Sequence, residues 1–78
     1  MTSEYAEKLG DYMQGVPEFL TVKEVADLFR LGPMTVYRMC RSGEITSTRF
    51  GRSYRIYTRI LMETHPVTRD HILKVTSK

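Results

Sequence analysis

Arginine side chains gather in the middle of this chain, between residues 30 and 59. This block holds seven arginines, no lysine and one acidic residue, Glu44, which gives it a net charge of +6. Residues 1–29, in contrast, carry a net charge of −4. The planar guanidinium group donates two parallel hydrogen bonds, a geometry that suits phosphate oxygens and guanine. The block therefore predicts a surface that faces a polyanion, with a merely solvated charged surface as the alternative.

A helical pattern within this block, residues 33–42, turns several side chains capable of polar or apolar contacts to one side. At about 100° per residue, they fall opposite or beside the apolar arc of the helix. These candidate residues are Met34, Thr35, Tyr37, Arg38 and Arg41. Outward side chains read base edges when a helix enters the major groove. We expect Arg38 to bond guanine, and Thr35 or Met34 to contact a thymine methyl group. Tyr37 or Thr35 can instead bond phosphate.

A hairpin tip at residues 49–55 is the second candidate surface. Its residues are Arg49, Gly51, Arg52, Ser53, Tyr54 and Arg55. Gly51 permits a tight turn, and Arg52 at the tip is expected to enter a minor groove, where narrow A·T stretches attract arginine. Ser53 and Tyr54 are candidates for phosphate contact. Arg49 and Arg55 share the same strand parity and are expected to point outward together. The alternative is a structural hairpin with solvated arginines.

The first helix of the motif begins at a capping box, because Thr21 is followed three residues later by Glu24. Its apolar face is predicted from residues spaced at helical intervals: Val22, Val25, Ala26 and Phe29. A tight turn at residues 31–32 separates it from the second helix. That helix has Gly32 as its N-cap, Pro33 at its first position and Gly43 at C′. Its core-facing residues are predicted to be Val36, Met39 and Cys40.

Two β-type runs follow, at residues 47–50 and 54–57, with Phe50 and Ile56 as the expected inward residues. Thr58 is expected to cap a short last helix that carries Ile60 and Leu61 and ends at Pro66. The fold class predicted from this order is α+β, mainly helical: a winged helix-turn-helix with two helices, a two-stranded wing and a short C-terminal helix. Its domain is placed at residues 17–64. Residues 1–16 form an N-terminal arm or short helix, and residues 65–78 a C-terminal tail or short helix.

Several other classes of function find no support in the sequence. Cys40 is the sole cysteine, which excludes an intrachain disulfide. His65 and His71 have no second cysteine nearby, so no metal site is predicted. No catalytic constellation and no phosphate-loop glycine spacing is present, so neither an enzyme nor a cofactor is expected. No apolar run reaches the ~20 residues of a membrane span, and the acidic N-terminus lacks an apolar signal region. We expect a cytoplasmic protein without a membrane partner.

Four blocks of the sequence resemble the bacteriophage excisionase and MerR-like winged-helix family. They are residues 20–26 (LTVKEVA), 35–38 (TVYR), 42–45 (SGEI) and 49–56 (RFGRSYRI), within a match over roughly residues 19–64. Two departures stand out. Arg30 and Leu31 replace the glycine-containing turn that is usual in the family, and Gly32 replaces the usual serine or threonine cap.

The resemblance implies a small protein that binds double-stranded DNA in a bacterial host cell, with its second helix in the major groove and its wing in the minor groove. In an excisionase, a recombination directionality factor, monomers bind cooperatively head to tail and bend the DNA. The bend directs a phage integrase, the implied partner, toward prophage excision. A small MerR-like transcription regulator acting at a promoter is the first alternative. A protein-interaction module, with Tyr5, Leu9 and Tyr12 of the N-terminal segment in contact with its partner, is the second.

Overall fold

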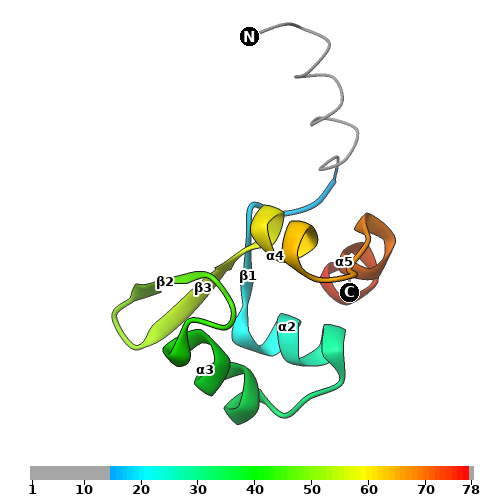
Figure 1. The fold of residues 1–78 in the computed structure, drawn as a ribbon. Helices are drawn as coiled ribbons and strands as arrows, with labels where there is room; N and C mark the ends of the chain where they lie inside the picture. Colours follow the sequence, from blue (N-terminus) through cyan, green and yellow to red (C-terminus); the bar gives the residue numbers. More distant parts are fainter. Residues whose placement is uncertain (1–14, 78) are drawn as a thin grey trace, which may run out of the picture.

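The computed structural model of the protein describes residues 15–77 (Figure 1). The elements in chain order are β1 (Phe19–Thr21), α2 (Val22–Phe29), α3 (Pro33–Ser42), β2 (Ser47–Phe50), β3 (Ser53–Tyr57), α4 (Thr58–Thr64) and α5 (Arg69–Thr76). Within residues 15–77, the fold is a small α+β domain with four helices and a three-stranded antiparallel sheet. The α+β class is confirmed. One detail of the prediction is wrong, since the hairpin belongs to a three-stranded sheet. Two helices follow the hairpin, and the second, α5, is the short helix that the sequence left open for residues 65–78. The predicted helical face of the N-terminal segment lies outside the described residues.

The start of α2 is fixed by the predicted capping box. Thr21 Oγ1 accepts a hydrogen bond from the Glu24 amide at 3.1 Å, and Glu24 Oε1 accepts one from the Thr21 amide at 2.9 Å. Two amide groups that the helix leaves unpaired are thus satisfied reciprocally. At the other end, Arg30 adopts a left-handed backbone with φ of +56°, the position where a helix often has glycine. The Leu31 amide then bonds the Ala26 carbonyl at 2.9 Å, which closes α2 before α3 begins.

Strand β3 lies in the middle of the sheet, between β1 and β2. The missed strand β1 is only three residues long, and Leu20 in it lies opposite Ile56. In the hairpin, Ser47 pairs with Ile56 and Phe50 pairs with Ser53. Because side chains alternate along a strand, Phe50 lies on the face opposite to Ile56. The prediction that both point inward is therefore wrong: Ile56 is fully buried, whereas Phe50 is 59% exposed.

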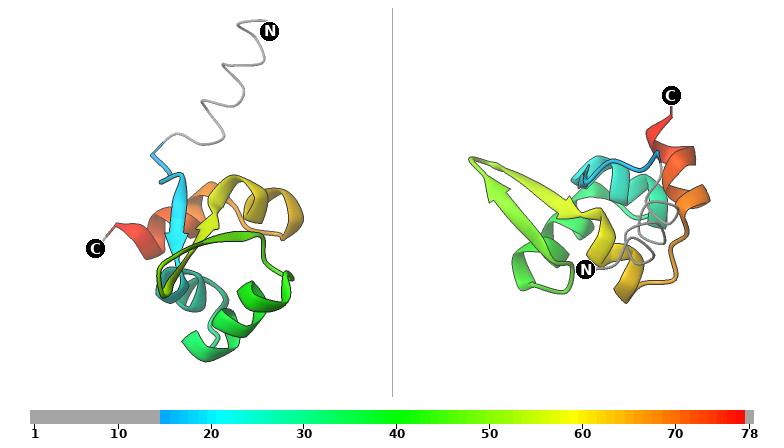
Figure 2. Two further views of the ribbon diagram at one scale, coloured as in Figure 1. Left: turned by 90° about the vertical axis from the view of Figure 1, so that its left-hand side faces the viewer. Right: turned by 90° about the horizontal axis from the view of Figure 1, so that it is seen from above.

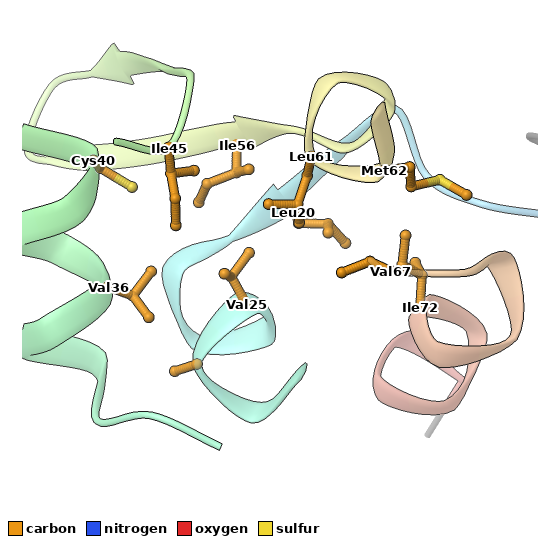
Figure 3. Close-up of a cluster of buried hydrophobic side chains, with 11 residues drawn as sticks. Leu20, Val25, Val36, Cys40, Ile45, Ile56, Leu61, Met62, Val67 and Ile72 are labelled. Atoms are coloured by element: carbon orange, nitrogen blue, oxygen red, sulfur yellow. The ribbon is translucent and has the colours of Figure 1, made fainter. Parts of the chain in front are cut away.

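The hydrophobic core lies between the helices and the inner face of the sheet (Figure 3). Its buried members are Leu20, Val25, Ala26, Val36, Cys40, Ile45, Ile56, Leu61, Met62, Val67 and Ile72. The predicted inward faces of α2 and α3 are confirmed at Val25, Ala26, Val36 and Cys40. Each fully buried Leu, Ile or Val side chain contributes roughly 1.5–3 kcal/mol. The pair Val25 and Val36, both without exposed surface, packs α2 against α3.

Helix α4 begins directly at the end of β3. Tyr57 occupies the N-cap position without a side-chain hydrogen bond, and Thr58, the expected cap, is already the first helical residue. The Thr58 amide donates to the Glu18 carbonyl at 3.1 Å, which ties the start of α4 to the chain just before β1. The Thr58 side chain consequently turns into the core, and its hydroxyl has no hydrogen-bond partner among the described residues.

Helix α5 completes the core from the C-terminal side. It begins at a second capping box, in which the His71 amide donates to Thr68 Oγ1 at 3.3 Å and the Thr68 amide donates to His71 Nδ1 at 3.2 Å. Ile72 is fully buried and Val67 almost so, and α5 packs against α2. The helix alternative for the end of the chain is therefore the one observed, and its residues share the core of the helices before it.

Candidate nucleic-acid interface

The outer face of α3 carries the residues that the sequence placed there. Met34 is 65% exposed, an unusual fraction for a large apolar side chain, and Thr35, Arg38 and Arg41 are exposed beside it. Val36, between them in sequence, is fully buried. The helix thus has a sharp division between a core face and an outer face with two arginines and one methionine. This geometry presents hydrogen-bond donors and one apolar contact to anything that lies against the helix.

The β2–β3 hairpin ends in a two-residue turn, Gly51 and Arg52. Gly51 has a φ of +61°, and Arg52 is not among the residues with positive φ. A positive φ at the first central position alone is the pattern of a type II′ turn, which favours glycine there. Arg49 Nε donates to the Gly51 carbonyl at 2.9 Å and so bridges the turn. Arg52 and Ser53 are exposed at the tip.

Two tyrosines join the hairpin to α3. The rings of Tyr37 and Tyr54 meet edge to face, with centroids 5.1 Å apart and planes at 78°. The Arg49 guanidinium also lies close to this contact, 5.9 Å from the Tyr54 ring centroid. Aromatic pairs and arginine–aromatic contacts at such distances are attractive. The sequence assigned Tyr37 and Tyr54 to phosphate contact, and the structure places both half-buried between the two predicted surfaces.

The expectation that Arg49 and Arg55 point the same way is wrong. Arg49 pairs with Tyr54 across the hairpin, whereas Arg55 pairs with Thr48. Directly paired residues share a face and neighbouring residues alternate, so the two arginines lie on opposite faces of the sheet. Arg49 extends over Tyr54 on the side of α3. Arg55 belongs to the outer face, where it also lies opposite Thr21 of β1.

A groove runs between the start of α2 and the β2–β3 hairpin. Its lining residues are Thr21, Val22, Lys23, Tyr37, Arg52, Ser53, Tyr54 and Arg55. Three of them are basic and none is acidic, which makes the groove a concave cationic surface beside α3. Sequence reasoning missed Lys23, because it lies in the acidic N-terminal part of the chain. The groove is formed because β3 continues beyond the end of β1 and faces the beginning of α2.

Comparison with known families identifies this arrangement. Residues 19–63 match the family model described as a helix-turn-helix domain. The chain belongs to this family. The match includes α2, the turn, α3, the β2–β3 hairpin and nearly all of α4, and therefore every residue of both candidate surfaces.

Two relatives of this helix-turn-helix domain come from strains of Mycobacterium tuberculosis. Each is 46% identical to the chain over 46 residues, and they carry the names "Putative DNA-binding protein MT0521" and "Putative DNA-binding protein Rv0500A". The matched segment covers 59% of this chain and 59% of each relative. The similarity thus extends over little more than half the length of the proteins compared. No solved structure matches the chain.

The arginines of the two surfaces in this helix-turn-helix domain form no ion pair within residues 15–77, although Glu44 lines the same surface hollow as Arg38. Within residues 15–77, the ion pair that forms is Arg59 Nε with Glu63 Oε1 at 3.5 Å on α4, on the surface and away from α3. Arg38, Arg41, Arg49, Arg52 and Arg55 make no ion pair with a described residue. Like charges at close range repel, and this repulsion is relieved when an anion binds between them. The interface is therefore electrostatically suited to a polyanion.

Cys40 lies behind the outer face of α3 and takes no part in it. Its side chain is 6% exposed. Burial raises the pKa of the Cys40 thiol, and a hydrogen bond with Ser47 offsets part of this effect. A buried thiol with a raised pKa has little reactive thiolate at neutral pH. The prediction of a core cysteine is confirmed.

Two further properties concern residues 15–77 as a whole. No helix in this part of the chain is long and apolar enough to cross a membrane. The same residues contain no group of three or more His, Cys, Asp or Glu side chains placed to hold a metal ion.

Proposed function

We propose that this protein binds double-stranded DNA in a sequence-specific manner, with α3 in the major groove and the β2–β3 hairpin as a wing on the adjacent groove. The observation that carries the proposal is the set of exposed arginines on α3 and on the β2–β3 hairpin, two elements held together by the Tyr37–Tyr54 contact. Exposed arginines without acidic partners are suited to a phosphate backbone and unsuited to an apolar protein surface. The names of the two mycobacterial relatives agree with this function.

In this proposal, α3 reads bases through its outer face. Arg38 bonds the O6 and N7 atoms of a guanine, a bidentate contact that contributes roughly 1–3 kcal/mol of discrimination against another base. Met34 and Thr35 lie about one turn earlier and contact a thymine methyl group. Arg41, one turn later, bonds guanine or phosphate. The chain has no asparagine and one glutamine, Gln14, so α3 lacks the side chains that usually read adenine.

The wing and the groove beside it hold the DNA backbone. Arg52 at the exposed turn enters the minor groove, with Gly51 permitting close approach of the main chain. Ser53 and Tyr54 bond phosphate, and Arg49 stacks on Tyr54 to keep that ring in place. Lys23 and Arg55, on opposite sides of the cationic groove, contact phosphates of the strand that crosses from one groove to the next. The contacts proposed here all come from residues 17–64, and α5 packs against α2.

For the biological role, we propose an excisionase-type directionality factor that bends DNA and directs a phage integrase toward prophage excision. Support comes from the family resemblance of the four sequence blocks and from the uneven distribution of charge. Among the described residues, Glu24 and Asp27 belong to α2, a different element from α3 and the hairpin that carry the arginines. A contact between these carboxylates of one monomer and the arginines of the next monomer on DNA would join unlike surfaces, and it would propagate head to tail instead of closing into a dimer.

A mobility-shift titration tests both levels of the proposal. Duplexes tiled across the neighbourhood of the gene, including any attachment site, are titrated with the protein at low salt. A ladder of cooperative complexes with anomalous migration is expected for an excisionase. One complex at a promoter, without bending and with repression of a reporter, would instead assign a MerR-like regulator. No specific shift at low salt would refute DNA binding by this surface.

Three single variants sharpen this titration. Arg38→Ala is expected to bind specific and nonspecific duplexes with similar affinity, because base contact is lost while phosphate contacts remain. Arg52→Ala is expected to lose affinity most for sites flanked by A·T stretches. Arg59→Ala is the matched control, since Arg59 already pairs with Glu63 on α4. Equal behaviour of all three variants and the wild type would contradict the assignment of the surface.

A further inference from the structure

Phe50 is a large aromatic side chain exposed where the core does not need it. It is the last residue of β2, on the outer face of the hairpin, and 59% of its surface is accessible. Its cross-strand partner is Ser53, a small side chain that cannot cover an aromatic ring. The neighbours on the same face, Thr48 and Arg55, are polar. No neighbouring side chain among residues 15–77 covers the ring on this face, so the apolar surface of Phe50 is available for an external contact.

The surroundings of Phe50 restrict what that contact is. It directly precedes the Gly51–Arg52 turn and follows Arg49, so the apolar ring has an arginine on each side in sequence. The hairpin tip projects away from α2, α4 and α5 (Figure 2). An apolar protein surface that covered Phe50 would also meet Arg55 on the same face and Arg52 at the turn. A DNA groove satisfies all three side chains, because phosphates surround the arginines while base pairs lie at its floor.

We infer that Phe50 is an apolar wedge that enters a base step in the minor groove next to Arg52 and bends the DNA. The inference rests on the proposed function and extends it to the device that produces the bend. Architectural proteins insert phenylalanine between base pairs, unstack them in part and kink the duplex by about 20–90°. Phe50 and Arg52 flank Gly51 at the same tight turn, so they are at most about 7 Å apart along the chain. The ring and the guanidinium are therefore close enough to address the same short stretch of one groove.

The inference also assigns different roles to the two faces of the hairpin. Arg49 and Tyr54 share the face that contacts Tyr37, and they fix the hairpin relative to α3. Phe50 and Arg55 share the opposite face, and Phe50 lies beside the turn with 59% of its surface exposed. A wedge requires a rigid support, because the energy of unstacking must be transmitted through the element that carries it. The Tyr37–Tyr54 contact and the pairing with β3 supply this support.

The test measures affinity, bending and unstacking on one duplex. The duplex carries the site that the wild-type full-length chain selects from a random-sequence library, with fluorophores at both ends and 2-aminopurine placed in turn at each step. Phe50→Ala is compared with Phe50→Leu and with Thr48→Ala, which changes the same face two residues away from the tip. Phe50→Ala is expected to bind about tenfold more weakly, as when one aromatic–base contact is removed. Its bend is expected to fall to less than half, with loss of the 2-aminopurine signal near one step.

The remaining variants distinguish a wedge from an ordinary surface contact. Phe50→Leu is expected to keep most of the bend, because leucine also acts as a wedge, and Thr48→Ala is expected to behave as wild type. The melting temperature of Phe50→Ala should stay within about 3 °C of wild type, as for a surface substitution. Specific binding by wild type with the same bend in Phe50→Ala would overturn the wedge and leave the proposed function intact. A large loss of melting temperature, or a change in self-association without DNA, would overturn it as well. Absence of any wild-type shift at low salt would refute the proposed function itself.

Discussion

The contact between Tyr37 and Tyr54 should contribute measurably to stability, and its energy can be isolated by a double-mutant cycle. The rings are 5.1 Å apart at 78°, within the range of favourable edge-to-face pairs. Replacement of each tyrosine by leucine keeps apolar volume and removes the ring. The interaction energy from the two single variants and the double variant is expected to be about 1 kcal/mol, within the range of roughly 0.5–1.5 kcal/mol for such pairs. Urea denaturation monitored by circular dichroism gives the four free energies of unfolding.

The same cycle applied to DNA affinity tests whether this contact positions the interface. If it fixes the hairpin beside α3, the single variants should each weaken specific binding and their effects should not add. Phe19 and Tyr57 provide a matched control, since their rings are also 5.1 Å apart but belong to β1 and the far end of β3. Their cycle should show coupling in stability and none in DNA binding. Additive effects within about 0.3 kcal/mol for Tyr37 and Tyr54 in both measurements would refute the reasoning.

Four further outcomes are expected from single substitutions. Lys23→Ala should lower the slope of log affinity against log salt by about 0.9, the value for one phosphate contact, whereas Arg59→Ala should not change it. Thr21→Ala should reduce the free energy of unfolding by about 1 kcal/mol in urea denaturation, because the capping box loses its hydroxyl acceptor. Arg30→Gly should raise the same free energy by about 0.5–1 kcal/mol, because glycine adopts the left-handed conformation without a Cβ penalty. Because burial raises the pKa of the Cys40 thiol, the neutral thiol contributes its full stabilisation of the fold at pH values below the ordinary thiol pKa. This contribution is lost as the pH rises toward the pKa of the thiol in the folded protein. Between about pH 8 and 10, the free energy of unfolding of wild type should therefore fall more than that of Cys40→Ala. Equal falls would contradict the stabilising effect of the buried neutral thiol.

Local rules were sufficient to predict the helices of the motif. The capping box at Thr21, proline at the start of α3 and Gly43 after its end each act within a few residues of chain, and all three were found as expected. The division of α3 into a buried and an exposed face also follows from its own periodicity. Strand β1 was missed for the opposite reason. Three residues have no periodicity to detect, and they form a strand only because β3 lies beside them in space.

The orientation of the hairpin side chains was predictable, but only through the turn. A two-residue loop at Gly51 and Arg52 makes Phe50 pair with Ser53 and fixes every pair behind it. Ile56 then pairs with Ser47, three residues from Phe50, so Phe50 and Ile56 cannot share a face. Parity counted along the chain ignores this constraint, and it led to the wrong prediction for Arg55 as well. A prediction of the cationic groove would also need the relative position of α2 and the hairpin, because the walls of the groove come from both.

The proposed site and the core occupy different parts of the same elements, and this separation has a consequence for the chemistry of the site. Val36 and Ile56 are fully buried and hold α3 and β3 in place, whereas Met34 and Phe50 are more than half exposed. The exposed residues add little to folding, and the unpaired arginines weaken it through mutual repulsion. Their types are therefore set by what the surface contacts and not by the requirements of the fold. Two large apolar side chains are exposed among arginines, one on α3 and one at the hairpin tip. This combination fits a ligand that has both charged and apolar parts. Double-stranded DNA is such a ligand, because it has phosphates along its edges and base surfaces within its grooves.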